Sequence, residues 1–477
     1  RIGPVRLIFI SKGLTLQARI KSNPEVKRHQ ILIFILSAIS ALGVISHFFP
    51  QDGVKVGGLT FKFASLKDVL GSQEKEPEIN TPSPEEILAM YNKAIADAQR
   101  ETFEKFFTSS PTRFYLPEDD YTFFDTVFTA FEKADSNAVR VVHYGDSQIE
   151  IDRVTHVIRD TLQKMFGGDG QGMLPARNYY TFSSAASTTD EGVRYMLFGN
   201  RYGGNEYGPY ADFVRTSGPA TLTYRHSASK TAKVRRFNQV TVLAGNTTGG
   251  GLNISCGDST VSFPAGEDYV RAIFSVPDSS ERVSVRLSAA ADIYGVLMDN
   301  NRGIAVDNVA MRGCSGTIFT QMNKEQLKRF YKEQNVKLIL LQYGGNRVPS
   351  IKNALHISNF CTSLRKQIRL IQSLAPDARL VFIGPSDMGR PGTYPAIPEL
   401  VDSLRCMATS EGAAYWDIFG AMGGKNSMAT WVNARPALAG SDHIHFTTRG
   451  AEKTGEMMMQ SLKLYYEYYL WRKEFEE

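Results

Sequence analysis

The sequence predicts an α/β protein with a mostly parallel sheet between helices, an inserted β-sandwich and an N-terminal transmembrane helix. Apolar strands and amphipathic helices alternate before residue 190 and again after residue 300, which is typical of a parallel sheet covered on both faces. Between them, residues 191–299 carry short alternating runs separated by Gly, Asn, Asp and Pro, a pattern typical of a β-sandwich. An uncharged run from Ile31 to Phe49 is long enough to cross a bilayer.

A chain of 477 residues is too long for one hydrophobic core, so we expect two folded units with appendages. The predicted parts are a cytoplasmic tail (1–30), a transmembrane anchor (31–49), a linker (50–84), N-terminal helices with the first part of the α/β domain (85–190), the inserted β-sandwich (191–299) and the second part of the α/β domain (300–477).

Basic residues precede the apolar run, at Arg19, Lys21, Lys27 and Arg28. The positive-inside rule therefore places the N-terminus in the cytoplasm. This predicts a single-pass protein of the cell membrane, anchored in the inner membrane, with everything after Phe49 in the periplasm or outside the cell. A buried core helix and a cleaved signal peptide are the alternatives, and the long N-terminal extension favours an uncleaved anchor.

Composition argues against several classes of protein. Lys plus Arg number 54 and Asp plus Glu 49, a mild excess of +5, and no basic stripe is interleaved with aromatic residues, so we expect no nucleic-acid partner. Cys256, Cys314, Cys361 and Cys406 are scattered without a CxxC motif, so neither a zinc site nor a redox motif is indicated and no pairing is predicted. The sequence indicates no metal and no cofactor.

In chain order, the first elements are helical. Ser83 is a plausible N-cap, with Pro84 in the first helical position of a helix over 85–107, and a second helix is expected over 121–134. A β-branched strand from Val139 then ends in Gly145-Asp146-Ser147. The glycine-rich segment 166–172 lacks the phosphate-binding GxxxxGK[ST] pattern, and an active-site loop is favoured there over a plain connector.

Ser147 is the candidate nucleophile. The apolar positions that follow it at helical spacing are Ile151, Val154, Ile158, Leu162 and Met165. A helix beginning directly after the strand would place Ser147 at the carboxyl edge of the sheet and at a helix N-terminus, where open α/β sheets bind ligands and negative charge is favoured. The alternative is an ordinary turn or helix cap.

Strand and helix alternate again in the second part of the α/β domain. The predicted strands are 303–311, 336–343, 379–384 and 414–418, and the predicted helices are 319–333, 353–374, 397–410 and a final one rich in Met and Tyr.

Acyl transfer by serine also needs a base and a group that orients it. His445 fits the base, and Asp442, three residues earlier, can reach its imidazole. The alternatives are a plain surface loop, or a metal site formed with His443, for which no carboxylate-rich partner motif is evident.

The oxyanion of such a reaction needs N–H donors at the ends of neighbouring strands. The Ser147 amide, the Gly316 amide and the Asn346 side chain are the candidates, although Gly316 and Asn346 would each suit a plain turn. Second copies of two of these tripeptides occur at 257–259 and 203–205. Both fall in or beside the β-rich insertion, without a strand-to-helix transition, so we do not expect them to be functional.

At these positions the chain resembles the SGNH (GDSL-type) hydrolase superfamily. The resemblance is carried by four blocks in the family's order, namely Gly145-Asp146-Ser147, Arg312-Gly313-Cys314-Ser315-Gly316, Gly344-Gly345-Asn346 and Asp442-His443-Ile444-His445. It implies Ser147 as nucleophile, His445 as base with Asp442 behind it, and an oxyanion hole formed by Ser147, Gly316 and Asn346.

A narrower resemblance extends from Gly145 through Phe166 to Gly170-Gln171-Gly172-Met173-Leu174-Pro175. This stretch is similar to bacterial peptidoglycan O-acetylesterases, in which a β-sandwich resembling a carbohydrate-binding module accompanies the SGNH domain. It implies a serine esterase acting on an O-acetylated cell-envelope glycan, with peptidoglycan the expected one. The alternatives are an O-acetyltransferase using the same residues and a catalytically dead glycan-binding protein.

In the inserted β-sandwich, Tyr202, Tyr207 and Tyr210 would form either a platform on which a sugar stacks or, as is more common in such domains, part of the hydrophobic core.

Overall fold

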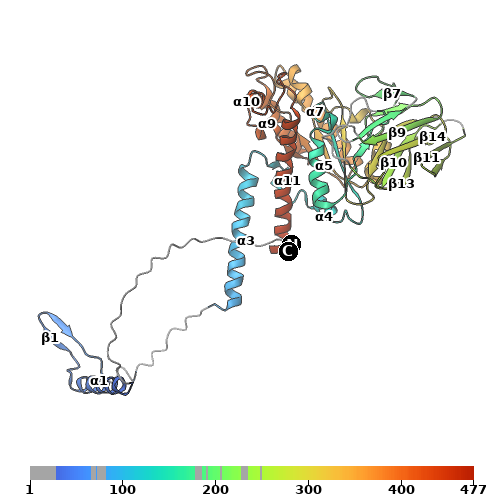
Figure 1. Cartoon of the computed structure of the whole chain (residues 1–477). Helices are drawn as coiled ribbons and strands as arrows, with labels where there is room; N and C mark the ends of the chain where they lie inside the picture. Colours follow the sequence, from blue (N-terminus) through green and yellow to red (C-terminus); the bar gives the residue numbers. More distant parts are fainter. Residues whose placement is uncertain are drawn as a thin grey trace. The chain divides into compact units, whose positions relative to one another are not determined.

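The computed structural model describes residues 28–65, 71, 82–177, 185–189, 192–204, 207–226, 235–247 and 250–476. The chain divides into two compact units, residues 1–90 and 91–477, which are described separately (Figure 1).

The first unit contains an apolar helix and a small hairpin. Helix α1 (Arg28–Phe48) includes a 20-residue span from His29 to Phe48 with a mean hydropathy of 2.3, so it is long and apolar enough to cross a membrane. Strands β1 (Val54–Val56) and β2 (Leu59–Phe61) pair antiparallel within the predicted linker. The tail 1–27, with three of the four basic residues, and most of 66–81 lie outside the described residues.

Helix α3 (Pro84–Ser109) starts at a capping box. The Ser83 hydroxyl accepts from the Glu86 amide at 3.1 Å, and the Glu86 carboxylate accepts from the Ser83 amide at 2.7 Å. Towards its end, the helix packs against α11 (Thr448–Phe475), where the ring of Phe107 stacks on Tyr465 at 4.6 Å between centroids. The predicted cap and helix are confirmed.

A six-stranded sheet forms the centre of the α/β domain. Its order is β16 (Ile304–Ala310), β4 (Val139–Gly145), β17 (Val336–Gln342), β18 (Arg379–Ile383), β19 (Ala414–Trp416) and β3 (Phe114–Tyr115). All neighbours are parallel except β3, which pairs antiparallel with β19 at the edge. Every residue of β4 is buried, as expected for a central strand between two helical layers.

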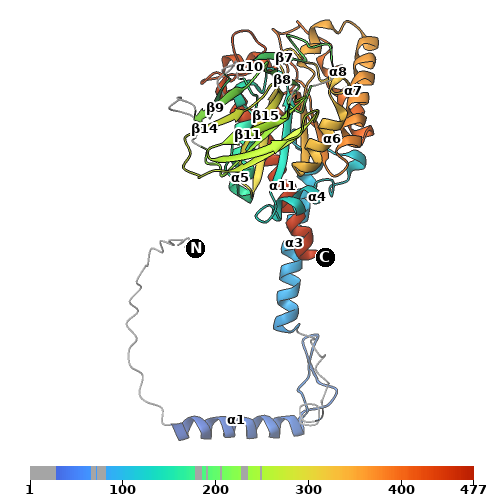
Figure 2. The same cartoon turned by 90° about the vertical axis from the view of Figure 1, so that its right-hand side faces the viewer.

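Two groups of helices flank this sheet (Figure 2). One group is α4 (Asp125–Glu132), α5 (Thr155–Phe166) and α11, and the other is α6 (Lys324–Glu333), α7 (Ala354–Leu374) and α8 (Ile397–Ser410). Short helices, among them η4 (Gly345–Ser350), α9 (Ile418–Ala421) and α10 (Ser427–Asn433), lie in the connections. The mostly parallel α/β architecture is as predicted.

The inserted domain consists of two antiparallel sheets. One runs β13 (Val270–Ser275), β10 (Gln239–Gly245), β15 (Asp292–Asp299), β8 (Asp212–Arg215) and β7 (Val193–Met196), with β5 (Gly172–Leu174) also paired to β15. The other runs β12 (Ser259–Phe263), β11 (Leu252–Cys256), β14 (Arg282–Leu287), β9 (Ala220–His226) and β6 (Ala185–Thr189). Buried and exposed residues alternate along β13 and β14, as a two-layer core requires.

Two strands of these sheets precede residue 191, where the insertion was predicted to start. Strand β5 has only three residues, and the sequence of β6, Ala-Ala-Ser-Thr-Thr, lacks the apolar alternation that marks a half-buried strand. Neither strand therefore gives a signal in the sequence.

The predicted active-site loop at 166–172 is wrong. Its glycines pack against the backbone of β15 and β16 and do not line the catalytic cavity: a Cβ at Gly170 would lie 2.3 Å from the Met298 oxygen, and one at Gly172 2.4 Å from the Val306 oxygen. The segment is a close-packed connector into β5, where the Met173 amide donates to Asp307 of β16 at 2.8 Å.

The helix expected directly after Ser147 is also corrected. Helix α5 begins only at Thr155, because the backbone turns first and the residues Ile151 and Asp152 adopt positive φ angles of 52° and 66°. Ile151 is 44% exposed instead of belonging to the apolar stripe, whereas Val154, Ile158 and Leu162 are buried as predicted. Ser147 thus lies at the carboxyl edge of the sheet in a turn, not at a helix N-terminus.

Candidate active site

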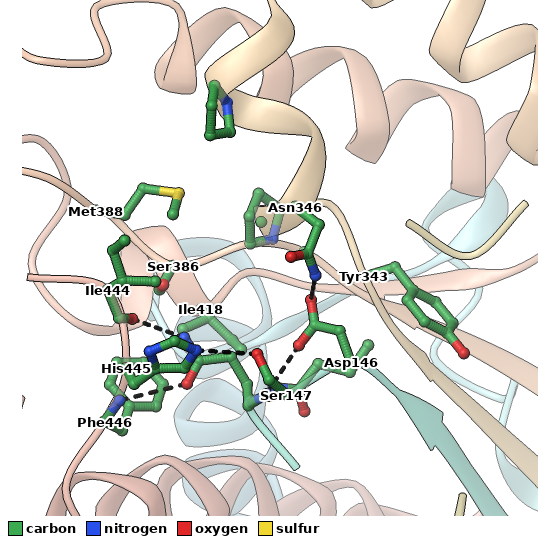
Figure 3. A pocket seen from close by; sticks show the side chains of 16 residues that line it. Asp146, Ser147, Tyr343, Asn346, Ser386, Met388, Ile418, Ile444, His445 and Phe446 are labelled. Atoms are coloured by element: carbon green, nitrogen blue, oxygen red, sulfur yellow. Dashed lines mark hydrogen bonds between the residues drawn. The ribbon is translucent and has the colours of Figure 1, made fainter. Parts of the chain in front are cut away.

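Three predicted residues, Ser147, His445 and Asp442, meet at the carboxyl end of the sheet, and Figure 3 shows the first two of them side by side. The Ser147 Oγ lies 3.0 Å from His445 Nε2, although the two residues are 298 positions apart in the chain. The His445 Nδ1 lies 2.7 Å from Asp442 Oδ2. Because an ionised carboxylate only accepts hydrogen bonds, Nδ1 carries the hydrogen, and Nε2 is left to accept from the serine hydroxyl.

Asp442 is held in place by its own loop. Its Oδ1 accepts from the amides of Ile444 and His445, at 2.9 and 3.1 Å. Burial alone would raise the pKa of Asp442, but the hydrogen bonds from the His445 side chain and from these two amides outweigh it and hold that pKa below its usual value. The carboxylate therefore stays ionised and fixes the imidazole.

Gln148 joins the serine turn to the histidine loop. Its Nε2 donates to the Ile444 oxygen at 2.7 Å, and its Oε1 accepts from the Phe446 amide at 3.3 Å. These two bonds bracket His445 on both sides in the sequence, so the residue after the nucleophile positions the base.

Asp146 and Asn346 form the opposite side of the site (Figure 3). The Asn346 Nδ2 donates to Asp146 Oδ2 at 2.9 Å and to the Cys314 oxygen at 3.1 Å, while Asp146 Oδ1 accepts from the Gln148 amide at 2.9 Å. Burial raises the pKa of Asp146 to about 6, although the bonds from Gln148 and Asn346 and the charge of His445 act in the opposite direction.

Gly316 is not among the residues that line the cavity beside Ser147. Its φ angle is 82°, and a Cβ there would lie 2.7 Å from the ring of Tyr343, so only glycine fits. Its amide donates a hydrogen bond to Cys314 Sγ, a weak acceptor, at 3.3 Å. The structure thus brings Ser147, Asp442, His445 and Asn346 together, whereas Gly316 does not line the cavity.

The cavity beside Ser147 has a volume of about 200 Å³. Its polar lining consists of residues just described, together with Gln342, Tyr343 and Ser386. The rest is largely apolar: Pro349, Pro385, Met388, Ile418, Ile444 and Phe446. Since pockets for drug-sized ligands usually measure about 300–1,000 Å³, this one suits a small acyl group.

The other residues considered from the sequence lie elsewhere. The second Gly-Asp-Ser forms the turn between β11 and β12, and Asn205 of the second Gly-Gly-Asn lies outside the described residues. Tyr207 and Tyr210 are buried, and Tyr202 packs against Phe213, so these tyrosines belong to the core. Within the described residues, no group of three or more His, Cys, Asp or Glu side chains could hold a metal ion, and the four cysteines are unpaired.

Two residues of the site have no assigned role in the sequence prediction, Asp146 and Gln148. Both flank Ser147, so proximity to the nucleophile is the only signal that could have indicated them. Their contacts run to residues 200 and 298 positions away, and no local pattern contains these.

Comparison with solved structures concerns the fold of the chain. A scan with protein-family models and a search of curated proteins each find no match. A peptidoglycan O-acetylesterase matches with a TM-score of 0.61 and 20% sequence identity, over 72% of this chain and 96% of that one. A family two carbohydrate esterase from Cellvibrio japonicus matches with a TM-score of 0.25 and 10% identity, over 60% and 99%, and TesA with 0.26 and 14%, over 34% and 81%. The chain has the fold of the SGNH hydrolases, with an additional β-sandwich.

Proposed function

We propose that this protein is a carboxylic ester hydrolase that removes O-acetyl groups from a cell-envelope glycan, with peptidoglycan as its substrate. The observation that carries the proposal is the hydrogen-bonded chain from Ser147 through His445 to Asp442. Nucleophile, base and orienting carboxylate stand in the arrangement that serine acyl transfer requires.

In the proposed reaction, Ser147 Oγ attacks the acetyl carbon while His445 Nε2 takes its proton. Asp442 stabilises the imidazolium that results. The sugar oxygen then leaves with the proton from His445, and water, activated by the same histidine, hydrolyses the acetyl-enzyme. No metal or cofactor enters these steps.

The oxyanion is proposed to bind the Ser147 amide, the Gly316 amide and the Asn346 side chain. Asn346 Nδ2 has two hydrogens, directed at Asp146 and at the Cys314 oxygen, so donation to the oxyanion shares or exchanges one of these bonds. For Gly316, the weak sulfur contact of its amide is readily replaced by a charged oxygen.

The substrate class rests on two observations. The small, largely apolar cavity suits an acetyl group and disfavours long acyl chains. A solved structure with the same overall fold is a peptidoglycan O-acetylesterase. The apolar helix α1, long enough to cross a membrane, and the basic residues before it support export of the catalytic domain out of the cytoplasm.

The experiment compares acetate release by the parent and by Ser147→Ala from O-acetylated peptidoglycan and from acetylated xylan. We expect release from peptidoglycan by the parent only, and hydrolysis of 4-nitrophenyl acetate but not of the octanoate. A folded Ser147→Ala protein with undiminished turnover would refute Ser147 as the nucleophile.

Two further measurements test the alternatives. Adding a deacetylated acceptor glycan distinguishes hydrolysis from acetyl transfer, and a lack of labelling by a fluorophosphonate would indicate a catalytically dead binding protein.

A further inference from the structure

We propose that a second cavity, at the seam between the β-sandwich and the α/β domain, binds a sugar residue of the same glycan chain whose acetyl group is removed at Ser147. The substrate class named here rests on the proposed function. The seam cavity has a volume of about 390 Å³ and shares no lining residue with the catalytic cavity.

Both domains contribute to the walls of the seam cavity. The β-sandwich provides Arg194 and Met196 of β7, Phe198 and Asp212, while the α/β domain provides the segment at Glu150 and Ile151 and the end of β16 with Met311 and Arg312. A ligand that fills the seam cavity therefore contacts both domains.

The α/β wall of the seam cavity is formed by the segments that also contain Ser147 and Gly316. Glu150 follows Ser147 by three residues, and Arg312 precedes Gly316 by four. Their side chains form a two-pronged ion pair, with Arg312 Nε and Nη2 at 2.8 and 2.7 Å from the two Glu150 oxygens. The Glu150 side chain is 6% exposed and that of Arg312 62%, so the buried carboxylate holds a guanidinium that faces outwards.

Ile151 gives an independent indication of function. A β-branched residue at φ 52° is strained, and this one presents 44% of its surface on the cavity wall instead of packing inside. Its neighbour Asp152 also has a positive φ and is fixed by the fully buried Arg159 at 2.5 and 3.0 Å. The fold therefore enforces the strained conformation, which is typical of binding sites.

The lining chemistry favours a sugar ring. Phe198 is 49% exposed and lies over Gly313, where an added Cβ would be 3.1 Å from its ring. With Met196 and Met311 it forms an apolar platform for a sugar face. Two ion pairs, Arg194 with Asp212 and Arg312 with Glu150, provide fixed donors and acceptors for hydroxyl groups. Since each arginine is matched by an acid, the lining favours a neutral ring over an anion.

The test replaces platform residues and compares two substrates. Phe198→Ala and Met196→Ala should lower kcat/KM for O-acetylated peptidoglycan at least fivefold, and that for 4-nitrophenyl acetate less than twofold. Val193→Ala is the matched control, because Val193 is 51% exposed on the same strand and does not line the cavity. It should change neither.

A second measurement separates this proposal from the esterase proposal. In Ser147→Ala protein, co-sedimentation with insoluble peptidoglycan needs no catalysis, and adding Phe198→Ala should weaken it at least fivefold. If proteins with Phe198→Ala or with Met196→Ala sediment with peptidoglycan as well as the protein without these changes, the seam site is refuted, even if the parent proves to be an esterase. A loss that depends on Phe198 would support the site, even if the parent releases no acetate. Equal losses on both substrates in the first test would also contradict it.

Discussion

At the scale of residues, Asn346 is the proposed side-chain donor of the oxyanion hole. The Asn346 Nδ2 donates to Asp146 at 2.9 Å and to the Cys314 oxygen at 3.1 Å, so the orientation of the amide is fixed before the substrate binds. Asn346→Ala should lower kcat roughly 10²–10³-fold, the usual effect of losing one oxyanion donor, with little change in KM. Steady-state kinetics on 4-nitrophenyl acetate measure this, and a loss of less than threefold would remove Asn346 from the oxyanion hole.

Asp146 predicts a pH dependence of stability. Its pKa is raised to about 6 in the folded state, whereas an unfolded aspartate titrates near about 3.9. Between these values the folded protein holds more protons, so this residue's contribution to the free energy of unfolding falls as pH rises, by about 3 kcal/mol in total. Asp146→Asn should remove that slope between pH 4 and 6. Denaturant unfolding at both pH values measures it.

The control for Asp146 is the exposed Asp258, in the second Gly-Asp-Ser. Asp258→Asn should leave the pH slope of the parent unchanged. Parallel stability curves for the parent and Asp146→Asn would show that the buried carboxylate does not titrate in this range.

At the scale of elements, the site depends on two loops, and Gln148 joins the serine turn to the histidine loop through two hydrogen bonds. Gln148→Ala removes both bonds to the loop of His445, and a base displaced by about 1 Å can cost on the order of 10²-fold in rate. We expect kcat to fall ten- to a hundredfold, with KM and the melting temperature nearly unchanged. Gln321→Ala, an exposed surface change, is the control. If Gln148→Ala kept parental kcat, the loops would be held together by other contacts.

The glycine-rich connector makes a prediction about stability. At Gly172 the φ angle is 85° and an added Cβ would meet the Val306 oxygen at 2.4 Å, so Gly172→Ala should cost at least about 2 kcal/mol of unfolding free energy. Gly218, with no atom within 4 Å of an added Cβ, is the matched control, and Gly218→Ala should stay within about 0.5 kcal/mol. Equal stability of the two variants would contradict the close packing.

These elements also show what a sequence can predict. The strand before Ser147 and the helices α3, α7 and α8 follow hydrophobic period and caps, which are local, so they were predicted closely. The turn over 147–154 and the role of the connector depend on contacts with β15, β16 and the histidine loop. The apolar spacing at 151, 154 and 158 carries no information about the ion pair between Asp152 and Arg159, which holds the turn before the helix. The predicted start of the helix therefore lies too early in the chain.

At the scale of the whole molecule, buried ion pairs as well as packed surfaces join the β-sandwich to the α/β domain. Arg140 of β4 is buried against Asp299 at the end of β15 and Asp307 of β16, and Asp307 also accepts from Met173 of β5. Removing one partner of such a cluster leaves a buried charge unmatched, which is strongly destabilising. The β-sandwich is therefore fixed to the catalytic sheet, and this rigidity is what a glycan bound across both domains would require.

The last prediction concerns the membrane. If α1 is an uncleaved anchor, the full chain should sediment with membranes, resist extraction by high salt and be released by detergent. Replacing Leu36 and Ile39, both in the middle of the apolar span, by arginine should shift the protein to the soluble fraction, since each arginine at a helix centre costs roughly 2.5–3.5 kcal/mol of insertion free energy. Val56→Arg, in the hairpin beyond the span, is the control and should stay with the membrane. A soluble parent chain would contradict the anchor, and a mature protein that begins after Phe49 would identify α1 as a cleaved signal sequence.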